Sequence, residues 1–248
     1  MNDPQLDSCA TVNATQDTTG CMGSTIKLAS GRYFDLLAPF IDEESMFDIS
    51  FALGNVCRFA GHTAFYSVAE HCVLASLLVE QDYNDPKLAL AVLLHDAAEA
   101  FVGDVSRPLK MLLPEYAGIE RRIQNAVNDH FLDGIEYDPS LVKRYDNILL
   151  KAEKKHFFPD DKVEWTGFEN VPNRKVGFAE MLSVHAAGVF YCRYHSLRAE
   201  LSRQDENAKL RVALADAIRR PMGVHPDSAA GLVTDEEVDA AEARRPRA

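Results

Sequence analysis

The most apolar stretch of the chain is PKLALAVLLHDAAEAFVG, residues 86–103. Asp85 and Pro86 make a good helix start, because Asp caps the first turn and Pro suits the first helical position. Gly103 can end a helix in the left-handed conformation. Leu88 to Leu94 is apolar on every side, which is typical of a buried helix. The pattern therefore predicts one buried helix from Pro86 to Gly103.

Similar signals predict further helices along the chain. Ser67 and Glu70 form a capping box, and apolar residues follow at helical spacing. Asp138-Pro139 repeats the Asp-Pro helix start. The expected elements are a short strand or hairpin within 25–45, helices at 49–57 (capped by Asp48), 67–80, 86–103, 114–132, 139–157, 175–203 and 206–220, and loops at 58–66 and 159–175. With almost no strand signal, the fold class is all-α, a helical bundle.

The two ends of the chain differ from its middle. Residues 1–24 and 221–248 are polar and lack periodicity, so we expect disordered tails. The body between them is expected as one domain over 25–205, followed by the helix 206–220.

Composition excludes several classes of protein. The formal net charge of −12 argues against binding duplex nucleic acid through a broad basic face, although a small basic pocket for a phosphate stays compatible. The five cysteines are scattered and form no CxxC pair, which favours a reducing cytoplasm over a disulfide framework. The N-terminus has no signal-peptide pattern, and the apolar runs are too short to span a membrane.

His95 and Asp96 stand together in the middle of the buried helix. A buried carboxylate is costly unless it is paired or binds a metal. Adjacent side chains leave a helix about 100° apart, close enough to share one ion. A His–Asp pair that is hydrogen-bonded inside the core explains the dipeptide equally well, so both interpretations stay open at this point.

Two more potential ligands lie on other predicted helices. His71 lies in the first turns of the 67–80 helix, and Asp146 adjoins the apolar stripe of the 139–157 helix. Together with His95 and Asp96 they form a mixed nitrogen and oxygen set. Such a set suits Mn, Co, Fe, Ni or Zn better than Ca, and the absence of thiolates argues against a structural zinc site.

Charged residues near these positions are candidates for a substrate site. Glu99 follows Asp96 by one turn, and Asp104 comes directly after Gly103. Arg58 and His62 lie in the loop at 58–66, and Lys110 follows the central helix. Taken singly, each is also explained as an ordinary helix, turn or surface residue.

The combined motif RF…SVAEH…LLHDAAEAFVGDVSRPLK…IE…VKRYD resembles the HD-domain metal-dependent phosphohydrolases, whose pattern is H…HD…D. It is similar to their 5′-deoxynucleotidase branch and to related phage dATP triphosphohydrolases, over about residues 32–158. The resemblance implies one divalent metal ion, a catalytic pair and a phosphate-binding arginine. The implied metal ligands are His71, His95, Asp96 and Asp146, the catalytic candidates are Glu99 and Asp104, and the phosphate-binding residue is Arg58, with His62 and Lys110 as weaker candidates for the same pocket.

The resemblance implies release of phosphate from deoxynucleoside 5′-monophosphates. A dNTP triphosphohydrolase or other nucleotide (alarmone) hydrolase is the first alternative, and a non-catalytic regulatory HD module that binds a nucleotide is the second. The short list of cations favours a monophosphate, and the presence of all expected ligands favours an enzyme. The expected partner is a small-molecule nucleotide, with neither duplex nucleic acid nor membrane. A homodimer, the base preference and the native metal stay open.

Overall fold

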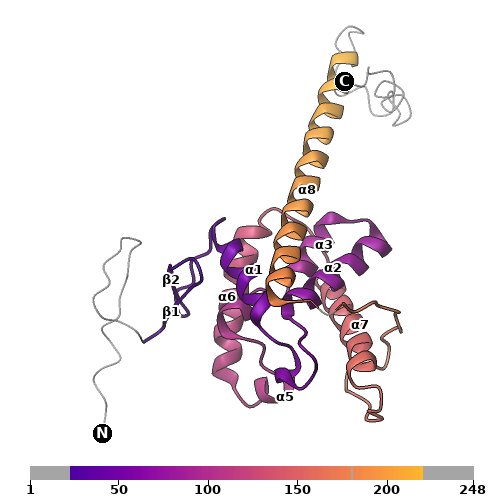
Figure 1. Cartoon of the computed structure of the whole chain (residues 1–248). Coiled ribbons are helices and arrows are strands. Elements are labelled where there is room, and N and C mark those ends of the chain that lie inside the picture. The colour runs from indigo at the N-terminus through magenta and orange to yellow at the C-terminus, as the bar shows by residue number, and fades with distance from the viewer. Residues whose placement is uncertain (1–22, 180, 220–248) are drawn as a thin grey trace. The chain divides into compact units, whose positions relative to one another are not determined.

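The structure is a computed structural model that describes residues 23–179 and 181–219. Over these residues its regular elements are helices apart from one two-stranded sheet, which confirms the all-α class (Figure 1). The elements are β1 (Thr25–Lys27), β2 (Tyr33–Asp35), α1 (Ser45–Asn55), the 3-10 turn η1 (Phe59–Gly61), α2 (Val68–Tyr83), α3 (Pro86–Leu93), α4 (Glu99–Val102), α5 (Arg107–Lys110), α6 (Pro114–Phe131), α7 (Pro139–Phe157) and α8 (Ser183–Arg219).

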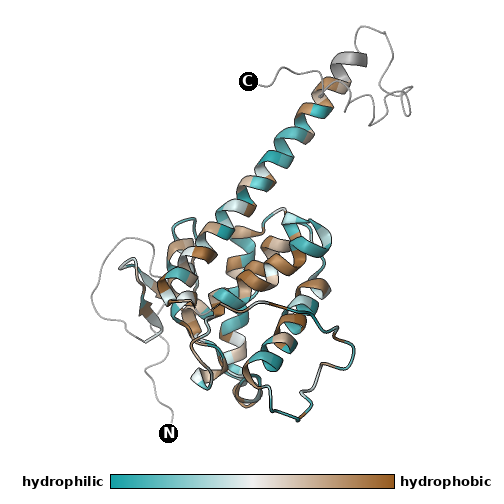
Figure 2. Cartoon of the chain, turned by 45° about the vertical axis from the view of Figure 1, so that its right-hand side comes forward, coloured by the Kyte–Doolittle hydropathy of each residue, from teal (hydrophilic) through white to brown (hydrophobic). Residues whose placement is uncertain are grey.

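The core is built around α3. This helix packs against α2 and α7, which also pack against each other. Every residue from Leu88 to Leu93 is buried, as the apolar sequence predicted. Figure 2 shows hydrophobic residues gathered on the helices of this core, whereas the outer part of the long helix α8 is mostly hydrophilic. The three helices therefore share one closely packed apolar core.

The predicted helix starts at Ser67, Asp85 and Asp138 are confirmed. Ser67 and Glu70 form the full capping box of α2. Asp85 accepts from two backbone N–H groups of the first turn of α3, and Asp138 accepts from the first turn of α7. These caps satisfy N–H groups that have no partner within a helix, so local sequence fixes where α2, α3 and α7 begin.

The predicted continuous helix from Pro86 to Gly103 is wrong in its middle. Helix α3 ends at Leu93, residues 94–98 form a turn, and the short helix α4 follows. Leu94 has φ −96° and ψ 3°, outside the helical region. Gly103 ends α4 with φ 80°, a conformation that glycine adopts readily.

The N-terminal hairpin pairs Ile26 with Phe34 in antiparallel register, as expected for residues 25–45. The following helix starts at Ser45, so the prediction that Asp48 caps a helix from Ile49 is wrong. Asp42 binds the Ser45 N–H instead. Asp48, 2% exposed inside α1, accepts hydrogen bonds from Ser30 and Arg32. The pattern missed this because an ion pair, rather than a cap, keeps Asp48 there.

The last helix begins at Ser183, eight residues later than the predicted start at Lys175. Phe178 explains the delay, because its ring contacts Tyr66, His156 and Phe157 and ties this segment to the body. At Gly54 of α1 an added Cβ would lie 2.6 Å from the Ser183 oxygen, so the start of α8 packs directly on the α1 backbone.

Helix α8 runs through residue 205 without the expected break before the 206–220 helix. The chain divides into two compact units, residues 1–195 and 196–248. The predicted disordered tails, 1–24 and 221–248, lie outside the described residues apart from Gly23 and Ser24. Within the described ranges, none of the helices combines the length and the apolar character that a bilayer span requires.

Candidate metal centre

Three segments bring the four predicted ligands together. His71 comes from α2, His95 and Asp96 from the turn after α3, and Asp146 from α7. The Nε2 atoms of the two histidines lie 3.4 Å apart. Asp146 Oδ1 lies 3.4 Å from Nε2 of His71 and 3.8 Å from that of His95. Asp96 Oδ2 lies 3.2 Å from His95 Nε2 and 3.9 Å from His71 Nε2.

The outer nitrogen of each histidine ring is already engaged. Nδ1 of His71 lies 2.6 Å from Oε1 of Glu153, and Nδ1 of His95 lies 2.7 Å from the Val92 carbonyl. Both partners only accept hydrogen bonds, so this network assigns a proton to each Nδ1. The two Nε2 lone pairs then face each other and the carboxylate oxygens. Such atoms repel one another unless a positive charge lies between them.

The pKa shifts of these groups also indicate that the centre favours a positive charge between them. Burial acts to lower the pKa of His95, but Asp96 and Asp146 outweigh it and raise that pKa well above its usual range. For Asp146, burial acts to raise the pKa, and the two histidines hold it well below normal. A proton or a metal ion can supply the positive charge that these four groups favour.

The donor spacing fits a single transition-metal ion. Ligand atoms about 2.1 Å from one ion lie about 3.0–3.5 Å from their neighbours. The five spacings between donor atoms, 3.2 to 3.9 Å, lie at and slightly above that range, so small side-chain movements suffice. Two imidazoles and two carboxylates suit Mn, Fe, Co, Ni or Zn. The residues therefore fit the metal that the sequence motif implies.

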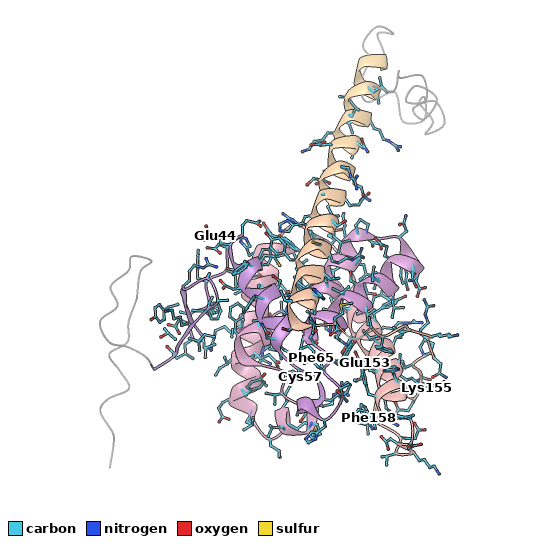
Figure 3. All side chains as sticks on the ribbon, viewed as in Figure 1. Glu44, Cys57, Phe65, Glu153, Lys155 and Phe158 are labelled. Carbon is cyan, nitrogen blue, oxygen red and sulfur yellow. The ribbon has the colours of Figure 1, made fainter. Side chains whose placement is uncertain are left out.

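Glu153 contacts the candidate centre, and the sequence reasoning did not single it out. It is fully buried on α7, where Figure 3 labels it. Oε1 accepts from the Tyr66 hydroxyl and faces His71 Nδ1, while Oε2 accepts from Arg58. Glu153 follows Asp146 by seven residues, two helical turns along the same face. That spacing was the available signal, but it lies within a segment whose other charges are solvated lysines.

Arg58 lies directly beside the centre. It is 7% exposed, with Nη2 bonded to Glu153 and Nη1 3.7 Å from Asp96 Oδ2. Its guanidinium therefore links a ligand to the carboxylate behind His71. His62 lies exposed at the end of η1, and within the described residues no hydrogen bond or ion pair joins it to the ligands.

Glu99, Asp104 and Lys110 gather on one side of the centre. Glu99 is 3% exposed; Oε1 lies 3.3 Å from Lys110 Nζ, and Oε2 is buried without a hydrogen-bond partner among the described residues. Lys110 also donates to Glu120, 2.6 Å away. Burial, with the charges of Asp96 and Asp104, raises the pKa of Glu99 well above normal. Burial likewise raises the pKa of Asp104, although Arg58 opposes it.

A cavity of about 290 Å³ adjoins the ligands. At the cavity wall, the Lys143 ammonium lies 2.6 Å from Asp146 Oδ2. The other oxygen of this carboxylate, Oδ1, faces the two histidines. A small molecule in the cavity would therefore contact three of the four ligands directly. The lining residues are Ala91, His95, Asp96, Gln124, Asn128, Tyr137, Pro139, Val142, Lys143 and Asp146.

The amino-acid sequence was compared with profiles of known families and with individual known proteins. No profile of a known protein family matches it. It is 37% identical to the uncharacterized protein YfdR of Escherichia coli over 177 residues, which make up 70% of this chain and 96% of that protein. The chain belongs to the YfdR family.

Two further relatives match shorter parts of this YfdR-family chain. An uncharacterized protein of Rhodobacter capsulatus is 37% identical over 115 residues, 42% of this chain and 57% of that protein. A 5′-deoxynucleotidase of Pasteurella multocida is 26% identical over 86 residues, 34% of this chain and 44% of that enzyme. This distant match suggests a nucleotide phosphohydrolase.

Proposed function

We propose that the chain is an HD-domain, metal-dependent phosphohydrolase that releases phosphate from deoxynucleoside 5′-monophosphates. The observation that carries the proposal is the convergence of four donor groups from three separate segments of the chain, with both histidine Nε2 atoms facing inwards. The distant similarity to a 5′-deoxynucleotidase supports the same class of substrate.

His71, His95, Asp96 and Asp146 would hold one divalent ion. When bound, such an ion supplies a Lewis acid for phosphoryl oxygens and lowers the pKa of coordinated water. Glu153 supports this role, because a carboxylate behind a ligating histidine fixes the ring orientation and increases its basicity.

Residues beside the ligands are suited to binding and proton transfer. Arg58 presents Nη1 towards the centre, where it can bind phosphate oxygens. Glu99 has one oxygen held near Lys110 and one buried oxygen without a hydrogen-bond partner among the described residues. A carboxyl of raised pKa can hand a proton to a leaving oxygen at neutral pH. Asp104, in the same group of charges, is the second carboxyl available for base or sugar contact.

The charge balance around the centre favours a monophosphate over a triphosphate. The cations near the centre are already paired with carboxylates. Arg58 pairs with Glu153, and Lys143 pairs with Asp146. Lys110 pairs with both Glu99 and Glu120. Little uncompensated positive charge is therefore left beyond the metal. A triphosphate carries more negative charge than a monophosphate and needs more cations to bind.

The remaining expectations belong to the same proposal. The partner is a small-molecule nucleotide, and a homodimer is compatible with the site. A cytoplasmic location agrees with the cysteines, since Cys57, Cys72 and Cys192 are all unpaired within the described part of the chain.

Product analysis tests the proposal. Purified protein is incubated with deoxynucleoside mono-, di- and triphosphates in the presence of Mn²⁺, Co²⁺, Ni²⁺, Zn²⁺ or Mg²⁺, and the products are separated. We expect inorganic phosphate and deoxynucleoside from the monophosphates. Asp96→Asn removes a ligand and should abolish release, whereas Asp133→Asn, at an exposed position, should not.

The other outcomes separate the alternatives. Tripolyphosphate from a dNTP alongside inert monophosphates would assign the chain as a triphosphohydrolase. Metal and nucleotide binding without turnover in any mixture would indicate a regulatory module.

A further inference from the structure

The side chain of Gln124 takes the place of a main-chain hydrogen bond beside His95 and Asp96. In an unbroken helix the Ala98 N–H would donate to the Leu94 carbonyl. Here the amide of Gln124, from α6, lies between these two groups. Oε1 accepts from Ala98 N at 3.0 Å, and Nε2 donates to Leu94 O at 2.8 Å. A side chain inserted into the hydrogen-bond ladder is a recognised cause of helix breaks, so Gln124 explains why α3 ends here.

The orientation of this amide is fixed. The second Nε2 hydrogen has an acceptor in Asn128 Oδ1, 2.9 Å away and one turn further along α6. All three contacts agree on which end of the amide is nitrogen. A flipped amide would set oxygen against the Leu94 and Asn128 oxygens. The inserted group therefore holds one conformation.

The opened turn changes what its two ligands can reach. Adjacent residues of a regular helix point about 100° apart, which already lets them share an ion, and in the open turn the backbone of residues 94–98 sets their arrangement instead. In the structure, His95 Nε2 and Asp96 Oδ2 lie 3.2 Å from each other. Ala97 N donates to Leu94 O, a tighter three-residue turn, and His95 Nδ1 bonds back to Val92 O. Each of these contacts depends on the local backbone of residues 94–98, which the Gln124 amide bridges.

We propose that Gln124 is a positioning residue for the metal centre: it keeps the turn open so that His95 and Asp96 face one ion. The inference rests on the proposed metal site and concerns a helix, α6, that supplies none of its ligands. Gln124 acts through the backbone of the turn and touches neither His95 nor Asp96 through a hydrogen bond.

The test compares metal affinity in two variants. Gln124→Met keeps the length of the side chain and removes both hydrogen bonds to the turn. Asn125→Met is the matched control, since Asn125 is exposed on the same turn of α6. Mn²⁺ affinity is measured by calorimetry on the full chain, and thermal unfolding is measured with EDTA present.

We expect Gln124→Met to weaken Mn²⁺ binding about 10- to 100-fold, the scale seen when a supporting residue behind a metal ligand is lost. The control should bind like the wild type. The unfolding temperature of metal-free Gln124→Met should stay close to that of the wild type, because the helix-favouring sequence can close the ladder between Ala98 and Leu94. Asn128→Ala loosens the amide without removing it and should give a smaller loss of affinity.

Equal Mn²⁺ affinity in wild type, Gln124→Met and Asn128→Ala would overturn the positioning role and leave the proposed function standing. A loss of affinity that only follows a lower metal-free unfolding temperature would assign Gln124 a general structural role and also overturn it. A wild type that binds no divalent ion would refute the metal centre itself, and the positioning role with it.

Discussion

At the scale of single residues, the centre is surrounded by side chains that each contact more than one neighbour. Glu153 contacts His71, Tyr66 and Arg58 at once, and both of its oxygens have partners inside the core. Burial acts to raise the pKa of Glu153, but Arg58 and His71 lower it, so the carboxylate stays ionised. A charged acceptor behind His71 makes that ring a stronger ligand.

Replacing Glu153 by Gln should therefore weaken metal binding. The variant keeps the shape but removes the negative charge behind His71, and we expect about a 10- to 100-fold loss of affinity for Mn²⁺. Equilibrium dialysis with metal analysis measures this, and Glu164→Gln, at an exposed position, is the control. Unchanged affinity would mean that Glu153 only neutralises Arg58.

The sequence contained the four candidate ligands but only part of what supports them. His71, His95, Asp96 and Asp146 are candidates because their spacing forms a known motif, and in the folded chain the spacings between their donor atoms are 3.2 to 3.9 Å. Glu153 could not be recognised because a lone glutamate among lysines resembles a solvated residue. Lys110 had the same ambiguity, since its partners Glu99 and Glu120 become neighbours only when α5 packs on α6.

At the scale of elements, local signals fixed the starts of helices better than their interruptions. Ser67, Asp85 and Asp138 act on their own next turn, so the sequence predicts them. The break after Leu93 depends on Gln124, a residue about thirty positions away, and leaves no mark in the helix-favouring local sequence. The late start of α8 has the same character, because distant aromatic rings hold Phe178.

The capping box of α2 should contribute measurably to stability. Ser67→Ala removes an acceptor for the Glu70 N–H, so we expect a loss of about 1 kcal/mol in the free energy of unfolding. Chemical denaturation measures the change. Ser106→Ala is a suitable control, since Ser106 precedes α5 but its side chain makes no capping hydrogen bond. Equal losses in the two variants would contradict this role of Ser67.

The junction between hairpin and α1 should make stability depend on acid. Burial acts to raise the pKa of Asp42, but hydrogen bonds from Arg32 and Ser45 lower it below 3.8. The unfolded chain therefore binds a proton at Asp42 more readily than the folded chain does. The stabilisation by Asp42 is complete at pH values above its pKa in the unfolded chain, and it is lost as the pH falls through its pKa in the folded chain. We expect Asp42→Asn to flatten the fall in unfolding free energy below about pH 4, as measured by urea titrations.

At the scale of the whole molecule, the proposed ion is a ligand of the folded state. Anything that binds only the folded chain raises its stability by mass action, about 2.7 kcal/mol at a concentration 100 times the dissociation constant. We therefore expect the unfolding temperature to rise steadily with free Mn²⁺ in the wild type. Asp96→Asn should show no such rise, and an identical rise in that variant would place the stabilising ion elsewhere.

The spread of the ligands along the chain has a further consequence for how the protein folds. In polymer terms, an ion held by α2, the turn after α3, and α7 is a cross-link that closes two loops of chain. Since α2, α3 and α7 pack against one another, apolar contacts close the same two loops that the ion would close. Chelation should therefore leave a folded protein, with slow amide exchange kept in these three helices and lost first in residues 94–98.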